Sequence, residues 1–128
     1  MTVRVLIADD HPVVRAGVTA LLGTDPNIEI VATAATPAQA LAAAATADLD
    51  LVLLDLQFSS DTDAPSGVDV TRKIRSQPNP PEVLILTNYD TDADILAAVE
   101  AGATGYLLKD APAEELLSAI HRSARGEG

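Results

Sequence analysis

The sequence predicts a single α/β domain in which helices cover both faces of a parallel sheet. Five short aliphatic runs alternate strictly with five helical segments along the 128 residues. Hydrophobic residues make up 48% of the chain and aromatic residues only 2% of it, as is typical of strands that are buried on both faces. Because strict alternation implies right-handed crossovers, we expect a doubly wound parallel sheet.

The expected strands are short runs in which Val, Ile and Leu predominate. They lie at residues 3–8, 28–32, 51–54, 83–86 and 105–108. Runs of this length and composition, bounded by polar or turn-forming residues, are typical of buried strands. We therefore expect all five to lie in one sheet.

The segments between these runs are expected to be helices. Their predicted ranges are residues 12–22, 37–47, 67–77, 91–101 and a last helix that follows Pro112. Proline suits the first turn of a helix, and Pro12 and Pro37 both stand at such positions. In the first helix, Val13, Val18 and Leu22 are expected to share one apolar stripe.

Charge and cysteine content exclude several functions. A net charge of -11 and a pI near 4.2 disfavour direct binding to DNA or to an anionic membrane. With no cysteine there can be no disulfide and no thiolate metal site, which fits a cytoplasmic protein. The apolar start of the chain is too short for a signal peptide or a membrane span, so no membrane association is expected.

Chemically active side chains follow four of the expected strands. Asp9 and Asp10 come after the first strand, Asp55 after the third, Thr87 after the fourth and Lys109 after the fifth. Ligands of doubly wound sheets bind at the carboxyl ends of the strands, so these side chains are expected to meet there. Any one of them alone would be better explained as a cap, a turn residue or a surface charge. Their joint placement makes that explanation improbable.

Three carboxylates at one edge of a sheet predict a site for a divalent cation. They would repel one another without a cation, and Mg²⁺ is the ion that combines carboxylates with phosphate oxygens. In such a site Asp55 can attack phosphorus, while the Lys109 ammonium neutralises charge on the phosphoryl oxygens. The residues therefore predict phosphoryl chemistry.

Three motifs in the chain resemble those of response regulator receiver domains from two-component systems. They are LIADDHP at residues 6–12, AGATGY at 101–106 and LLKD at 107–110, and their form is similar to that of the NarL/FixJ (LuxR-type) subgroup. The resemblance covers essentially the whole chain. It implies a flavodoxin-like (βα)5 fold with strand order 2-1-3-4-5.

The resemblance also implies a role for each site residue. Asp9, Asp10 and the backbone carbonyl of Gln57 would hold Mg²⁺ together with Asp55, which a sensor histidine kinase would phosphorylate. Lys109 would pair with the phosphoryl oxygens. Such a protein is a signalling switch, so turnover of a substrate is not expected.

The switch itself, by the same resemblance, would be Thr87 and Tyr106. The threonine hydroxyl would move to bond the phosphoryl group, and the aromatic ring would turn into the space it leaves. An alternative of similar weight is that Tyr106 is a half-buried strand aromatic with a role in packing and none in the switch. Phosphorylation would then strengthen a homodimer formed by the fourth helix, fifth strand and fifth helix. Ile95, Leu96 and Val99 either offer apolar surface there or belong to the core.

The domain division follows from the resemblance as well. Residues 1–122 are expected to form the receiver domain, and residues 123–128 to start a linker to a helix-turn-helix domain missing from this sequence. DNA would be bound only through that C-terminal domain.

Departures from the family pattern leave alternatives open. The segment 57–66 is longer than the usual turn, lacks the usual proline, and adds Asp61 and Asp63 near the site. An atypical receiver that works without phosphorylation is therefore the main alternative. A phosphatase with an aspartyl-phosphate intermediate needs an acid where Gln57 stands, and a flavin module needs a phosphate-binding loop that the sequence lacks. His11 is expected at the rim of the site.

Overall fold

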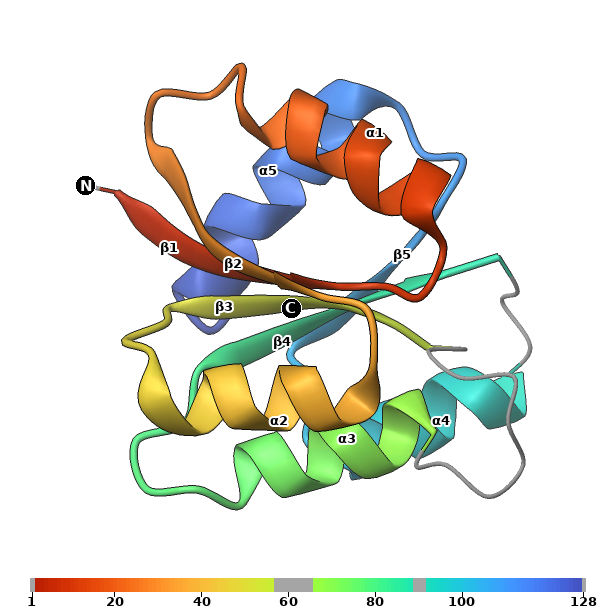
Figure 1. Ribbon diagram of the computed structural model, residues 1–128. Helices are drawn as coiled ribbons and strands as arrows, with labels where there is room; N and C mark the ends of the chain where they lie inside the picture. The colour runs from red at the N-terminus through yellow and green to blue at the C-terminus, as the bar shows by residue number, and fades with distance from the viewer. Residues whose placement is uncertain (1, 57–65, 89–91, 128) are drawn as a thin grey trace.

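The structure is a computed structural model that describes residues 2–56, 66–88 and 92–127. It consists of a central sheet between two layers of helices (Figure 1). The strands are β1 (Val3–Ala8), β2 (Ile28–Ala34), β3 (Leu51–Asp55), β4 (Glu82–Thr87) and β5 (Gly105–Leu108). The helices are α1 (Pro12–Leu22), α2 (Pro37–Thr46), α3 (Gly67–Arg75), α4 (Asp92–Glu100) and α5 (Ala113–Ala124).

All neighbouring strands pair in parallel, and their order is β2-β1-β3-β4-β5. The predicted doubly wound α/β fold and its strand order are therefore confirmed. The order reverses at β1, since the chain moves outward to β2 and then crosses to β3. This switch point lies between β1 and β3, where ligands of such sheets bind.

Alternate strand residues pack into two separate cores, one on each face of the sheet. Leu6 of β1 joins the core beneath α2, α3 and α4, whereas Val5 and Ile7 join the core beneath α1 and α5. The period of two in side-chain direction explains this division. Figure 1 shows the same grouping, with α1 and α5 on one side of the sheet and α2, α3 and α4 on the other.

Local signals in the sequence set the starts of three helices. Pro12 occupies the first turn of α1, and the Thr36 side chain accepts a hydrogen bond at the start of α2. At α3, Ser66 and Asp69 form a reciprocal capping box. The backbone N–H and then the hydroxyl of Ser66 donate to Asp69, and together they lower the pKa of its carboxyl from the ordinary value.

The ends of the elements differ slightly from the predicted ranges. β2 continues two residues further, to Ala34, whereas α3 stops at Arg75 rather than at residue 77. α4 ends at Glu100, one residue before the predicted end. The φ of Gly102 is 109°, a left-handed conformation that closes this helix and that glycine adopts without strain.

One prediction about packing was wrong. Val13 was expected to share the buried stripe of α1, but its side chain is 85% exposed. Val13 precedes the buried Leu22 by about two and a half helical turns, which places the two side chains on opposite faces. Val18, about one turn before Leu22, does pack against the core.

Among the helices in the described part of the chain, none is both long and apolar enough to cross a membrane.

Candidate functional site

The three predicted carboxylates meet at the carboxyl ends of β1 and β3. Ala8 pairs with Leu54 across these two strands, so Asp9 and Asp10 emerge beside Asp55. One ligand atom from each carboxylate and one from His11 all lie within 4.8 Å of one another. Asp9 and Asp55 are buried, whereas Asp10 is partly exposed. We refer to Asp9, Asp10 and Asp55 together as the acidic pocket.

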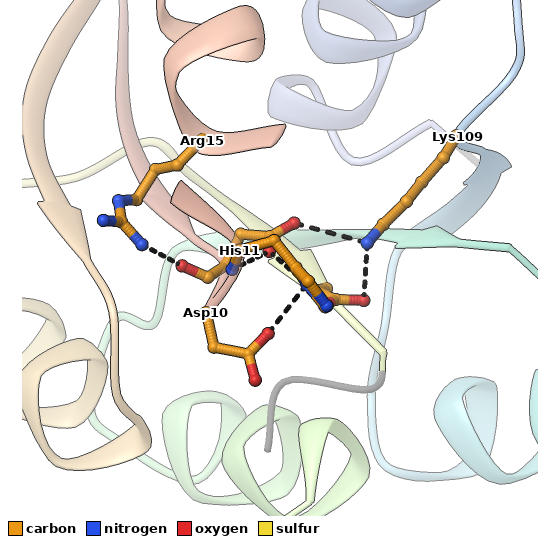
Figure 2. Close-up of polar contacts among 6 residues, drawn as sticks. Asp10, His11, Arg15 and Lys109 are labelled. Carbon is orange, nitrogen blue, oxygen red and sulfur yellow. Dashed lines mark hydrogen bonds and ion pairs between the residues drawn. The ribbon is translucent and has the colours of Figure 1, made fainter. Parts of the chain in front are cut away.

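Lys109 supplies the positive charge nearest to the two buried carboxylates. Its Nζ lies 3.2 Å from Oδ1 of Asp55 and 3.4 Å from Oδ2 of Asp9, and its side chain is 12% exposed. β5 brings the lysine to this place, and its backbone N–H donates to the carbonyl of Thr87 at 2.9 Å. Figure 2 shows the extended side chain of Lys109 reaching these carboxylates. An ion pair this deeply shielded is screened weakly by salt.

His11 lies on the other side of the pocket from Lys109. Its ring Nδ1 is 3.1 Å from Oδ1 of Asp9, 2.9 Å from Oδ1 of Asp10 and 3.8 Å from Oδ2 of Asp55. The ring is 59% exposed, so the rest of the imidazole faces solvent. Its position at the rim agrees with the sequence prediction, but the inward direction of Nδ1 was not anticipated (Figure 2).

The chemistry of the pocket fits a divalent cation. Oδ1 of Asp10 is buried, and none of the described residues donates a hydrogen bond of good geometry to it. His11 Nδ1 lies 2.9 Å from this oxygen, but outside hydrogen-bonding geometry. A buried anionic oxygen without a donor is costly, and a hard cation among three carboxylates would offset that cost.

The backbone around β1 is held by groups outside the pocket. Arg15 donates from Nη1 to the carbonyl of Asp9 at 2.7 Å, and the backbone N–H of His11 donates to Oδ1 of Asp9 at 2.8 Å. Arg15 was not among the site residues predicted from the sequence. Its place one helical turn beyond His11 is a weak signal, since an arginine there is usually a surface charge.

Thr87 and Tyr106 lie on neighbouring strands but in different surroundings. Thr87 is buried at the end of β4, directly beside the end of β5 in the register of the sheet. Tyr106 is 48% exposed, so its ring lies on the outer surface of β5 in this conformation. Asn88 follows Thr87 and is exposed.

Glycine at position 67 allows α3 to begin directly against the end of β3. A Cβ at this position would lie 2.3 Å from the carbonyl oxygen of Leu56 and 2.7 Å from that of Asp55. Both distances are far below any real van der Waals contact. Glycine is therefore required for this close approach beside Asp55.

The remaining predicted ligand, the carbonyl of Gln57, lies outside the described residues. The same is true of Asp61 and Asp63 in the long segment after Asp55. Their predicted effects on the pocket remain predictions.

The chain is thus a doubly wound α/β domain with an acidic pocket and a lysine at the carboxyl edge of its sheet. The family model described as the response regulator receiver domain matches residues 5–121. The chain therefore belongs to the response regulator receiver domain family.

Curated relatives place the chain near the NarL/LuxR-type members. The nitrate/nitrite response regulator protein NarP of Escherichia coli K12 is 42% identical over 96% of this chain and 55% of its own length. The response regulator protein VraR of Staphylococcus aureus is 35% identical over 99% of this chain and 59% of its own length. This chain thus spans little more than half of either relative.

Solved structures agree with this assignment. The signal receiver domain of the putative response regulator NarL from Mycobacterium tuberculosis superposes with a TM-score of 0.89 at 32% identity, covering 98% of both chains. A LuxR-family two-component response regulator from Aurantimonas gives a TM-score of 0.90 at 35% identity, over 99% of this chain and 88% of its own. The predicted family and subgroup are therefore confirmed.

Proposed function

We propose that this chain is a phosphorylation-dependent switch in which Asp55 accepts a phosphoryl group from a sensor histidine kinase. The observation that carries the proposal is the convergence of Asp9, Asp10, Asp55 and Lys109 at one edge of the sheet. This arrangement combines a nucleophile, a cation site and a fixed ammonium group. Each is required for phosphoryl transfer to a carboxylate.

The residues that would hold Mg²⁺ are Asp9, Asp10 and Asp55, with the carbonyl of Gln57 as a further ligand. Bound Mg²⁺ supplies charge neutralisation at the phosphoryl oxygens. Asp9 and Asp10 therefore bind and orient, and neither attacks phosphorus. Receiver domains are signalling proteins, so we expect no release of product from an external substrate.

In the transfer step a carboxylate oxygen of Asp55 forms a bond to phosphorus. The bond between phosphorus and the phosphohistidine nitrogen of the kinase breaks, and the electron pair remains on the imidazole. Lys109 Nζ lies 3.2 Å from Asp55 Oδ1 before the reaction. It is therefore close enough to pair with the negatively charged phosphoryl oxygens after the transfer. The hydroxyl of Thr87 then bonds the phosphoryl group from the adjacent end of β4.

Output would pass through the face formed by α4, β5 and α5. Leu96, Val99 and Tyr106 are exposed apolar side chains on this face. Inward movement of Tyr106 after Thr87 would change the shape of this surface and favour a homodimer. A C-terminal helix-turn-helix domain, joined by a linker that follows α5, would then bind DNA as a dimer.

Intact mass measurement tests the phosphoacceptor. The chain is incubated with acetyl phosphate and Mg²⁺, beside an Asp55→Asn variant and a sample without metal. One phosphoryl adduct, absent from both controls, is the expected result. Absence of the adduct while calorimetry still detects Mg²⁺ binding would favour the alternative, an atypical receiver that works without phosphorylation. Absence of both would remove the proposed mechanism.

A further inference from the structure

The position of His11 beside the acidic pocket supports an inference about which metal ions the pocket binds. Each buried carboxylate directs one oxygen to Lys109 and has its other oxygen near His11. Oδ2 of Asp9 and Oδ1 of Asp55 contact Nζ, whereas Oδ1 of Asp9 and Oδ2 of Asp55 lie 3.1 and 3.8 Å from Nδ1. Nδ1 therefore lies among three carboxylate oxygens of the pocket, the third from Asp10 at 2.9 Å.

These separations are close to those within a tetrahedral metal site. Four donors at about 2.0 Å from a zinc ion lie about 3.3 Å from one another. The three distances from Nδ1, between 2.9 and 3.8 Å, scatter around that value. One ligand atom from each of the four residues lies within 4.8 Å of all the others, so a four-donor site forms if the carboxylates move up to about 1.5 Å closer together.

The chemistry of these four donors, three carboxylates and one imidazole, determines which metal ions the site binds well. Imidazole is a good ligand for Zn²⁺ and similar borderline ions, whereas Mg²⁺ prefers oxygen ligands and retains water. For Mg²⁺ the ring must leave its place among the carboxylates. For Zn²⁺ the neutral ring would bind through Nδ1 and carry its hydrogen on Nε2.

We propose that His11 makes the acidic pocket a closed site for a borderline divalent cation such as Zn²⁺, held by Asp9, Asp10, His11 and Asp55. The inference rests on the proposed function, since it concerns the same pocket. A site with four protein donors leaves no coordination position for a phosphoryl oxygen. Zn²⁺ bound in this way would oppose phosphorylation, so the identity of the metal would regulate the switch.

Long-range ¹H–¹⁵N correlation spectra of the imidazole rings test the proposal directly. The chain has two histidines, and His121 lies far from the pocket, where it pairs with Asp25 at 2.9 Å. With one equivalent of Zn²⁺ and no Mg²⁺, the Nδ1 resonance of His11 is expected to move to a metal-bound value. The ring of His121 serves as the internal control and is expected to remain unchanged.

Calorimetry on a matched variant gives the second readout. His11→Gln is expected to raise the Kd for Zn²⁺ about tenfold or more, since one ligand is lost. The Kd for Mg²⁺ is expected to stay within about threefold, because Mg²⁺ does not use the ring. The His11 side chain makes no capping hydrogen bond to α1. His11→Asn, which keeps an N–H donor near Asp9, is the control variant for an intact fold.

The outcomes separate this inference from the proposed function. Zn²⁺ binding that leaves the His11 resonances unmoved would overturn the inference and leave the carboxylate pocket as proposed. Equal losses of Zn²⁺ and Mg²⁺ affinity in His11→Gln would also overturn it. Failure of both ions to bind would remove the inference and the metal site of the proposed function together.

Discussion

Replacement of Gly67 by alanine tests how closely α3 must approach the strand that carries Asp55. The added Cβ would lie 2.3 Å from the carbonyl oxygen of Leu56 and 2.8 Å from its carbonyl carbon. Relief to an ordinary contact of about 3.4 Å requires a movement of about 1.1 Å in backbone, not in a flexible side chain. Overpacking of this kind costs about 1–3 kcal/mol.

The measurement is urea unfolding of Gly67→Ala followed by far-UV circular dichroism. We expect the midpoint to fall by about 1 M, given the usual dependence of unfolding free energy on urea for a small domain. Gly17→Ala is the matched control, because a Cβ there meets nothing within 4 Å and the residue lies inside α1. Alanine at position 17 should stabilise the domain by about 0.5–1 kcal/mol. Equal stability of Gly67→Ala and the unmodified chain would refute the argument.

Three further substitutions probe the pocket, the α5 contact and the core. Without metal, Asp10→Asn should raise the free energy of unfolding by about 1 kcal/mol, because repulsion among the carboxylates of the acidic pocket is relieved. The same variant should lose its stabilisation by Mg²⁺, and unfolding in EDTA and in Mg²⁺ measures both effects. A bond from the His121 ring, followed by one from the Asn27 backbone, lowers the pKa of Asp25 from 3.8, so this carboxylate stabilises the fold above that pH. His121→Ala should therefore destabilise the domain at pH 7, and the difference should close as the pH falls below 3.8; a difference that persists well below pH 3.8 contradicts this pairing. Ile120→Ala, at a fully buried position of α5, should lower the free energy of unfolding by about 2–5 kcal/mol, measured by heat or urea. Val13→Ala, at an exposed position, should lower it by less than about 0.5 kcal/mol, and similar losses for the two variants would contradict the burial of α5.

Alternation of strand and helix was enough to predict a doubly wound parallel sheet, whereas the strand order came from the family resemblance. The strand ends were also predictable, because the carboxyl ends of parallel strands meet at one edge whatever the details of the helices. For this reason Asp9, Asp55 and Lys109 were placed together from their positions after the first, third and fifth runs. The motifs then made the family recognisable.

Features that depend on rotation and close contact were not predictable. The exposure of Val13 depends on how α1 is rotated about its own axis relative to the sheet. The apolar residues at the start of α1 led to a wrong prediction of that rotation. The inward direction of His11 Nδ1 depends on a side-chain rotamer. The contact at Gly67 depends on how closely the start of α3 approaches the end of β3, which a glycine in the sequence does not reveal.

A further unpredicted feature ties three elements together at the opposite edge of the sheet. Arg75 of α3 pairs with Glu82 of β4 at 3.4 Å and donates to the carbonyl of Pro81 at 2.9 Å. The hydroxyl of Thr104 donates to Glu82 from the turn before β5. Thr104 and Glu82 are 22 residues apart in sequence, so their contact follows from the tertiary fold and not from a local pattern.

The identity of the phosphorylated residue is the central claim, and chemical trapping tests it most directly. After reaction with acetyl phosphate and Mg²⁺, borohydride reduces an aspartyl phosphate to homoserine, which peptide mass spectrometry locates in the chain. The account predicts homoserine at position 55, and none at Asp9 or Asp10, whose place is to bind the metal. Homoserine at either of those positions, or at none in a chain that binds Mg²⁺, would contradict it.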